Sequence, residues 1–255
     1  VSKEIGFLVV DECHRCPSRT FTEAVTEFDS RYMLGLSATP YRRDNLSRLI
    51  FWHLGDVHHK IDQERLVQSG DVLAAEVIIR ETKFKPYYDP VNEFSKMMSE
   101  LSQDDKRNRL IASDIAAEVE KNKGICLVLS DRKKHCETLQ SILRFRYKIS
   151  AGLLIGDLSA AERQAVMDQL DQGDIKVLIA TGQLIGEGFD RSDLSPLFLV
   201  TPIKFSGRVL QYLGRVLRPA PGKEKARVYD YVDVQVDVLK AMARARQKTY
   251  SGRNV

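Results

Sequence analysis

The chain has 255 residues, of which 43% are hydrophobic and 29% charged, a composition typical of a folded globular protein rather than a disordered one. No apolar run reaches the length of a membrane span, and no targeting sequence precedes the first predicted strand. The net charge of +4 is compatible with a nucleic-acid partner, although such a mild excess does not establish one.

The cysteines are scattered, which favours reduced thiols in a cytoplasmic protein. Cys13 and Cys16 form a lone CxxC pair, and a zinc site would need a second pair at short spacing, which Cys126 and Cys136 do not supply. The chain opens on Val1 rather than Met and enters a strand almost at once. We therefore expect a piece of a longer protein.

Two short strands are predicted first, and each is followed by residues that can carry chemistry. The apolar run 5–10 is typical of a strand buried on both faces of a parallel sheet, and Asp11 and Glu12 follow it. A second strand over 32–36 ends in the segment 37–40, because Pro40 cannot continue a central strand. Helices are predicted over 21–28 and 46–54.

Residues 56–94 are less regular. A strand is predicted over 76–80, and Pro86 and Pro90 indicate a linker over 86–94. Residues 1–85 are therefore interpreted as the C-terminal part of one α/β domain.

From residue 95 onward, predicted strands alternate with amphipathic helices, which indicates a parallel sheet with helices on both faces. Ser159 and Glu162 form a predicted capping box at the start of one helix. The basic stretch 244–248 could add affinity for phosphate, but a solvated helix face is favoured. Residues 95–255 are thus expected to form one complete α/β domain, with strands over 125–129, 150–155, 176–180, 197–200 and 227–231 and helices over 104–122, 132–145, 159–170, 206–217 and 236–247.

Asp11 and Glu12 are adjacent carboxylates at the C-terminal end of a strand, where open α/β sheets bind their ligands. Nucleotide hydrolysis requires one carboxylate to hold Mg²⁺ and another group to orient and deprotonate water. Taken alone, the pair reads more simply as a solvated acidic turn. The rest of the chain reverses that preference.

Five segments resemble the motifs of superfamily 2 helicases, in the expected order and on the expected kinds of element. Asp-Glu-Cys-His at 11–14 resembles motif II, the DExH box, and Ser-Ala-Thr-Pro at 37–40 resembles motif III. Segments 127–132, 180–190 and 211–219 resemble motifs IV, V and VI, the last in its QxxGRxxR form. The DECH box and motif VI look most similar to the XPB-type and type III restriction-type branch.

This resemblance implies a RecA-like second motor domain preceded by part of a first one, with ATP and Mg²⁺ as cofactors. The partner would be nucleic acid, with double-stranded DNA favoured over RNA. Asp11 would hold Mg²⁺, Glu12 would activate water, and His14 would connect the ATP site to motif VI, with Gln211 as its partner.

The resemblance also assigns roles to the remaining motifs. Ser37 and Thr39 would couple hydrolysis to domain movement, and Arg215 and Arg218 would be arginine fingers, a role that suits a planar and permanently charged side chain. The nucleotide would also be bound by Gly188 and Asp190, and the nucleic-acid phosphates by Thr181, Gly182, Ser130 and Arg132.

The sequence departs from the family in one respect: no G-x-x-x-x-G-K-[ST] loop occurs in it. We expect the intact protein to hydrolyse ATP and this chain alone to be inactive, and we expect the partial first domain to associate with the second or with another copy. Two other interpretations stay open, a non-catalytic binding module and the motor subunit of a restriction-type complex.

Overall fold

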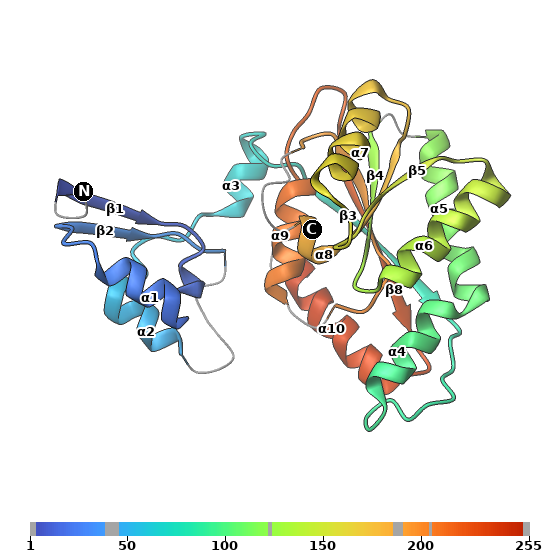
Figure 1. Cartoon of the computed structure of the whole chain (residues 1–255), viewed down its shortest axis with the longest axis horizontal. Helices are drawn as coiled ribbons and strands as arrows, with labels where there is room; N and C mark the ends of the chain where they lie inside the picture. Colours follow the sequence, from blue (N-terminus) through green and yellow to red (C-terminus); the bar gives the residue numbers. More distant parts are fainter. Residues whose placement is uncertain (1–3, 39–45, 122–123, 186–190, 204–205, 252–255) are drawn as a thin grey trace. The chain divides into compact units, whose positions relative to one another are not determined.

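The computed structural model describes residues 4–38, 46–121, 124–185, 191–203 and 206–251 (Figure 1). The chain divides into two compact units, residues 1–62 and 63–255, and each is described by itself. Among the described residues, no helix combines the length and apolar character needed to cross a membrane.

The first unit contains a two-stranded parallel sheet. Strand β1 (Phe7–Val10) pairs with β2 (Tyr32–Gly35), so that the carboxyl ends of both strands lie at the same edge. Helices α1 (Arg19–Thr26) and α2 (Ser47–Leu54) contribute to a single small core with the strands and with the 3₁₀ turn η2 (Cys13–Arg15). That core contains Val10, Cys13, Cys16, Val25 and Ile50.

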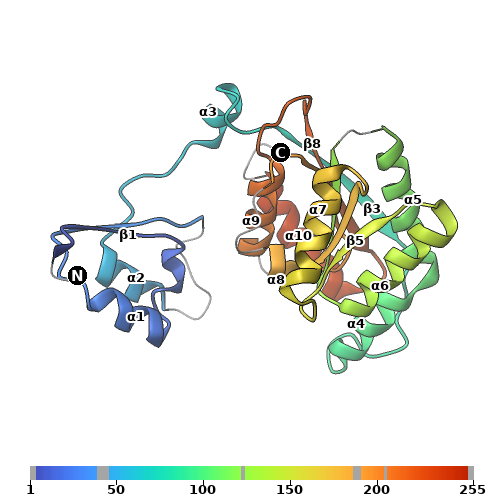
Figure 2. The ribbon, with the colours of Figure 1, turned by 45° about the horizontal axis from the view of Figure 1, so that its top comes forward.

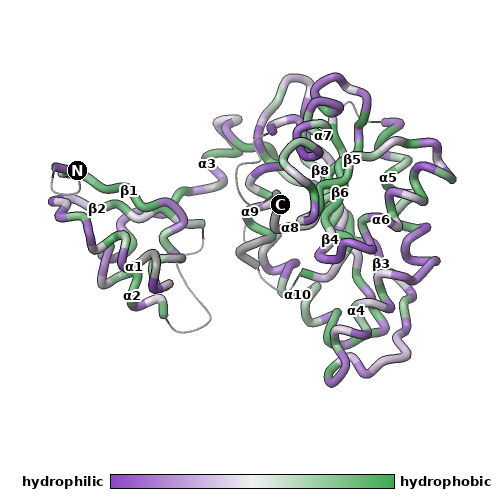
Figure 3. Tube along the Cα trace, viewed as in Figure 1, coloured by the Kyte–Doolittle hydropathy of each residue, from purple (hydrophilic) through white to green (hydrophobic). Residues whose placement is uncertain are grey.

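The other face of this sheet is apolar and exposed. Phe7 and Val9 of β1 are 56% and 48% exposed, and their partners Tyr32 and Leu34 are 59% and 44% exposed. Figure 3 shows the apolar character of these strands. The prediction that the first strand is buried on both faces is wrong for the described residues, because α1 and α2 share one core on a single face. Self-association through this unit stays a prediction.

The second unit is built on a six-stranded sheet in which every pair of neighbours is parallel. The order across the sheet is β3-β8-β7-β4-β6-β5. The strands are β3 (Ala75–Thr82), β4 (Ile125–Ser130), β5 (Ala151–Leu154), β6 (Val177–Thr181), β7 (Leu194–Leu199) and β8 (Ala226–Asp233).

Helices cover both faces of this sheet (Figures 1 and 2). Successive residues of β4 alternate between two cores: Leu127 and Leu129 pack with α7, α9 and α10, whereas Cys126 and Val128 pack with α5 and α6. The predicted RecA-like α/β architecture is confirmed. The helices are α3 (Gln63–Gln68), α4 (Phe94–Gln103), α5 (Asp105–Lys121), α6 (Lys133–Ile142) with its π-helical continuation η3 (Leu143–Tyr147), α7 (Ala160–Gln172), α8 (Gly182–Ile185), α9 (Ser206–Val216) and α10 (Asp237–Ser251).

The predicted capping box of α7 is confirmed. The backbone N–H of Glu162 donates to Ser159 Oγ at 3.3 Å, and the Glu162 carboxylate accepts from the Ser159 N–H at 2.8 Å. Gly173 ends the helix with a φ of 77°, a conformation that favours glycine.

The predicted domain boundary requires correction. Strand β3 pairs with β8 along its whole length, from Ala75 opposite Ala226 to Thr82 opposite Asp233, and therefore belongs to the second unit, which begins at Gln63. The segment predicted as a linker leads into helix α4, and Phe84 is buried against it. A strand whose partner lies so far along the chain leaves no local sign of which domain it joins.

Two buried ion pairs connect helices to β8. Arg107 of α5 donates through Nε to Asp233 Oδ1 at 2.8 Å and through Nη1 to the Val200 carbonyl at 2.7 Å, and both side chains are fully buried. Arg246 of α10 donates to Asp230 at 2.7 to 3.1 Å. Arg246 is therefore a core residue, which corrects the interpretation of residues 244–248 as wholly solvated.

The Arg107→Met variant should lower the unfolding free energy of the second unit by about 3–5 kcal/mol, because it leaves the buried Asp233 carboxylate without its cation. Arg109→Met in the same helix is the control, since Arg109 is 57% exposed and its pair with Asp105 is worth only about 0–1 kcal/mol. Hydrogen exchange of the β8 amides at increasing urea concentration measures the unfolding free energy of both variants. Equal losses in the two variants would contradict the assignment.

Candidate functional site

In the first unit, the residues that follow β1 and β2 are held together by backbone hydrogen bonds. The Leu36 N–H donates to the Val10 carbonyl at 2.9 Å, and the Cys13 N–H donates to the Leu36 carbonyl at 2.9 Å. The acidic turn 11–12 and Ser37 therefore lie beside each other at the carboxyl edge of the sheet, as the resemblance to motifs II and III implies.

Glu12 adopts a left-handed backbone conformation with a φ of 49°. This conformation costs a residue other than glycine about 1–3 kcal/mol, and such residues cluster at functional sites. The Glu12 N–H donates to Asp11 Oδ1 at 2.8 Å, which stabilises the turn. The turn leaves Asp11 exposed and Glu12 half-buried.

The ring of His14 connects the two motifs. Its Nδ1 lies 3.0 Å from Glu12 Oε2 and 3.1 Å from Ser37 Oγ. The side chain of His14 is only 18% exposed, so its orientation is fixed by packing as well as by these contacts. One nitrogen thus positions the Glu12 carboxylate relative to Ser37, whereas Thr39 lies outside the described residues.

Gly35 is a contributor that the sequence reasoning missed. A Cβ at this position would lie 2.9 Å from Leu54 Cδ1 and 3.2 Å from Cys13 Sγ. Only glycine lets the end of β2 approach the DECH turn and α2 this closely. The signal in the sequence was a glycine inside an otherwise apolar strand, which indicates a close approach of the backbone.

The chemistry of the exposed carboxylate fits Mg²⁺, which prefers oxygen ligands and usually combines one or two carboxylates with several waters. Asp11 is the residue that would hold it. The thiols beside it do not suit metal binding, because burial raises the pKa of Cys16 to about 11 and also raises that of Cys13. In the part of the chain that the structure describes, no cluster of three or more His, Cys, Asp or Glu residues could hold a metal ion.

In the second unit, three motifs meet at the carboxyl ends of β4 and β6. Ser130 lies opposite Thr181 in the parallel ladder, and Gly182 follows directly at the start of α8. A Cβ on Gly182 would lie 2.0 Å from Tyr212 Oη of α9 and 3.4 Å from Asp131 Oδ1. Motifs IV, V and VI are thus in mutual contact around Gly182.

The side chains of Ser130 and Arg132 are engaged within the protein, and their role in binding nucleic acid stays a prediction. The hydroxyl of Ser130 is 1% exposed, lies 3.0 Å from His135 Nδ1 and accepts from the Arg132 N–H at 3.2 Å. The guanidinium of Arg132 donates to Ser99 Oγ at 2.9 Å and to the Ser95 carbonyl at 3.0 Å, both on α4. Both residues anchor the motif IV loop through these contacts.

The sequence reasoning missed the histidine that supports this loop. His135 Nε2 lies 2.9 Å from Asn108 Oδ1, and Asn108 Nδ2 donates to the Ser102 carbonyl at 3.0 Å. Because the amide oxygen faces the ring, Nε2 is the donor and Nδ1 accepts from Ser130. Burial, and secondarily the charge of Arg107, lowers the pKa of His135 to about 3, so the ring is neutral.

Helix α9 has a buried face and a less buried face, and motif VI contributes residues to both. Its buried side chains recur at helical spacing: Val209, Tyr212, Leu213 and Val216. Gln211 and Arg215 are half-buried on another face, and Arg218 is exposed just beyond the helix, which ends one residue before the predicted Leu217. Gln211 and Arg215 are four residues apart and therefore lie on one face of α9, whereas Gly188 and Asp190 lie outside the described residues.

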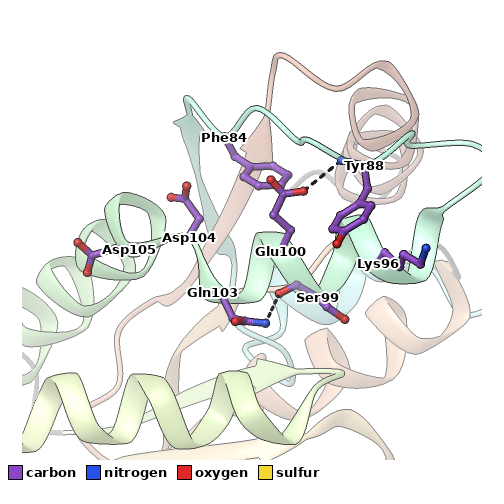
Figure 4. Close-up of a pocket in the computed structure, with 8 residues that line it drawn as sticks. All are labelled: Phe84, Tyr88, Lys96, Ser99, Glu100, Gln103, Asp104 and Asp105. Carbon is purple, nitrogen blue, oxygen red and sulfur yellow. Dashed lines mark hydrogen bonds between the residues drawn. The ribbon is translucent and has the colours of Figure 1, made fainter.

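A cavity of about 590 Å³ lies between α4 and the chain that precedes it (Figure 4). Its acidic groups are engaged within the protein: Glu100 accepts from the Tyr87 N–H at 2.9 Å, and Asp104 accepts from the Arg107 N–H at 2.7 Å. The helicase-like motifs 11–14, 37–40, 127–132, 180–190 and 211–219 contribute none of its lining.

Two protein families match the chain in succession. Residues 1–42 match the family described as "Type III restriction enzyme, res subunit", and residues 106–220 match "Helicase conserved C-terminal domain". These ranges contain the DECH and SAT segments in the first case and motifs IV to VI in the second.

Curated relatives and solved structures agree with these matches. The chain is 27% identical to a putative ATP-dependent RNA helicase of Acanthamoeba polyphaga mimivirus over 98% of this chain and 47% of that protein. It is 26% identical to the DNA repair helicase/translocase XPB-R of Trypanosoma brucei brucei, over 87% of this chain and 29% of the relative. It therefore spans less than half the length of either relative.

The fold is shared with a fragment of a putative HsdR subunit of a type I restriction enzyme from Vibrio vulnificus. The TM-score is 0.69 and the identity 16%, over 96% of this chain and 45% of that one. Taken with the order and placement of the motifs, these family matches and relatives support a superfamily 2 helicase, related to the XPB-type and restriction-type branch.

Proposed function

We propose that the intact protein is an ATP-driven helicase or translocase that acts on nucleic acid, with double-stranded DNA preferred. The observation that carries this proposal is the contact of His14 with both Glu12 and Ser37. A solvated acidic turn would need neither the strained Glu12 backbone nor a half-buried histidine that links it to the next strand.

In the first unit, Asp11 holds Mg²⁺ and Glu12 is the general base. The metal, when bound with ATP, neutralises charge on the phosphates. The Glu12 carboxylate removes a proton from the attacking water, and His14 orients that carboxylate through Nδ1. Ser37, which contacts the same nitrogen, couples hydrolysis to domain movement together with Thr39.

In the second unit, Arg215 and Arg218 stabilise charge that develops on the transferred phosphoryl group. Gly188 and Asp190 bind the nucleotide. Thr181 and Gly182 contact nucleic-acid phosphate at the carboxyl end of β6. Contacts to phosphate and sugar carry no sequence information, which suits a motor that moves along its track.

Support for DNA comes from the relatives, since XPB-R is described as a DNA repair helicase/translocase and the phage T4 relative as an ATP-dependent DNA helicase. The mimivirus relative is described as an RNA helicase, so RNA is the alternative substrate. A motor subunit of a restriction-type complex is a second alternative, favoured by the match of residues 1–42. The third, a non-catalytic binding module, is disfavoured by the built Glu12 site.

Glu12→Gln in the intact protein should lower nucleic-acid-stimulated ATP turnover by about 100-fold or more, because the amide cannot accept the proton of water. ATP affinity should change little, since the base acts on water rather than on the nucleotide. Steady-state turnover and equilibrium ATP binding measure the two effects, with duplex DNA and single-stranded RNA compared as stimulators.

The matched control is Glu23→Gln on α1, whose carboxylate pairs only with the exposed Arg19 among the contacts described. It should retain wild-type turnover. If Glu12→Gln also retains wild-type turnover, Glu12 is not the general base, and that result would favour the interpretation as a non-catalytic binding module.

The isolated chain of residues 1–255 should show no nucleic-acid-stimulated ATP hydrolysis. Its sequence contains no Gly-Lys loop to hold the phosphates between the general base and the arginines. A phosphate-release assay with and without duplex DNA makes the measurement, and robust turnover by the purified chain would refute this expectation.

Gly182→Ala should lower the melting temperature of the second unit and weaken nucleic-acid binding, because the new methyl group would overlap Tyr212 Oη. Adding Tyr212→Phe removes the nearest atom and should restore part of the loss. Gly214→Ala is the folding control, since nothing lies within 4 Å of its Cβ and alanine favours the helix by about 0.5–1 kcal/mol. Equal melting temperatures for the Gly182 and Gly214 variants would argue against the close contact.

A further inference from the structure

The end of helix α9 is held by an unusual set of contacts. The last carbonyl groups of a helix have no partner within it and must be satisfied elsewhere. In this chain, three successive carbonyls at the end of motif VI are all bonded: those of Val216 and Arg218 accept from Lys223 Nζ, and that of Leu217 accepts from the Leu73 N–H at 2.8 Å.

Lys223 connects this helix end to the central sheet. Its Nζ lies 2.6 Å from the Val216 carbonyl and 3.0 Å from that of Arg218. The same nitrogen lies 2.9 Å from the Ser192 carbonyl and 2.8 Å from the Leu194 carbonyl, at the start of β7. One ammonium group therefore bonds four backbone carbonyls, two at the end of α9 and two at the start of β7.

A cation is the suitable group at this place. The carboxyl end of a helix carries partial negative charge, which favours a positive side chain. Asp193 adds a carboxylate nearby, and Arg191 neutralises that carboxylate by donating to it at 2.7 and 3.0 Å. Burial lowers the pKa of Lys223 to about 8 against the opposing effect of Asp193, so the amine is mostly protonated at pH 7.

The contacts of Lys223 and Leu73 hold the segment that carries the two arginines proposed to contact the nucleotide. Arg215 lies in the last turn of α9, and Arg218 is itself one of the residues whose carbonyl Lys223 holds. Leu73, which holds the carbonyl between them, belongs to the segment by which the chain enters the second unit. A displacement of this helix end would move both guanidinium groups together.

We infer that Lys223 is a positioning residue for the arginines of motif VI: its ammonium group fixes the end of α9 to the start of β7 and so sets where Arg215 and Arg218 lie. This inference rests on the proposed function of those arginines. Its effect should be seen in turnover rather than in substrate affinity, because arginine fingers act mainly on the transition state.

The test uses three variants of the intact protein. Lys223→Met keeps the aliphatic length and removes the donors, Lys225→Met is the control on an exposed lysine two residues away, and Arg215→Ala gives the effect of losing one finger. We expect Lys223→Met to lower kcat for stimulated ATP hydrolysis about ten-fold, with KM for ATP and the Kd for duplex DNA within about two-fold of wild type. Lys225→Met should match wild type.

A spectroscopic measurement separates positioning from general destabilisation. The amide signals of Leu217 and Arg218 should titrate with a midpoint near pH 8 in the wild type and in Lys225→Met, and this titration should vanish in Lys223→Met. An unchanged kcat in Lys223→Met, with Arg215→Ala inactive, would overturn the inference and leave the proposed function standing. Full activity of Arg215→Ala would overturn both.

Discussion

Parallel strand pairing is the constraint on which the arrangement of the motifs depends. Because β4 and β6 run in the same direction with Ser130 opposite Thr181, the segments that follow them emerge at one edge of the sheet. In the first unit, β1 and β2 do the same for the acidic turn and Ser37. Segments far apart in the sequence are thereby brought within hydrogen-bonding distance without any long-range signal between them.

Buried polar groups then fix these segments more precisely than apolar packing could. Arg107 holds the Val200 carbonyl, and the Thr201 hydroxyl that follows accepts from the Asp131 N–H at 2.9 Å. The neutral ring of His135 forms a hydrogen bond with the hydroxyl of Ser130. A buried charge or amide has few arrangements that satisfy it, so such networks favour a single loop geometry. Lys223 has the same effect at the C-terminal end of α9, where its ammonium group bonds the carbonyls of Val216 and Arg218.

Local patterns predicted most of the elements of the second unit. Continuous apolar runs predicted β4 and β6, and Ser159 with Glu162 predicted the start of α7, because burial on both faces and helix capping are written in adjacent residues. The patterns did not reveal that β3 joins β8 or that α4 exists beside it, since those depend on pairing across the chain.

The candidate site was predicted in its residue types and less well in their environments. The motifs indicated Glu12, His14 and Ser37, and the structure places the three in contact, although their roles stay predictions. Ser130 matched a motif equally well and is buried, and Arg132 bonds to α4, because a sequence pattern does not show whether a neighbouring helix takes up a side chain. Lys223 belonged to no motif and became visible only through its four carbonyl contacts.

The central proposal is that the intact protein couples ATP hydrolysis to the binding of nucleic acid, through contacts with the phosphates and sugars of that nucleic acid. The most direct measurement is the rate of ATP hydrolysis as a function of duplex DNA concentration, at low and at high salt. The account predicts strong stimulation that is independent of DNA sequence and that requires more DNA as salt rises, because phosphate contacts release counterions. A turnover rate that is the same with and without nucleic acid would contradict it.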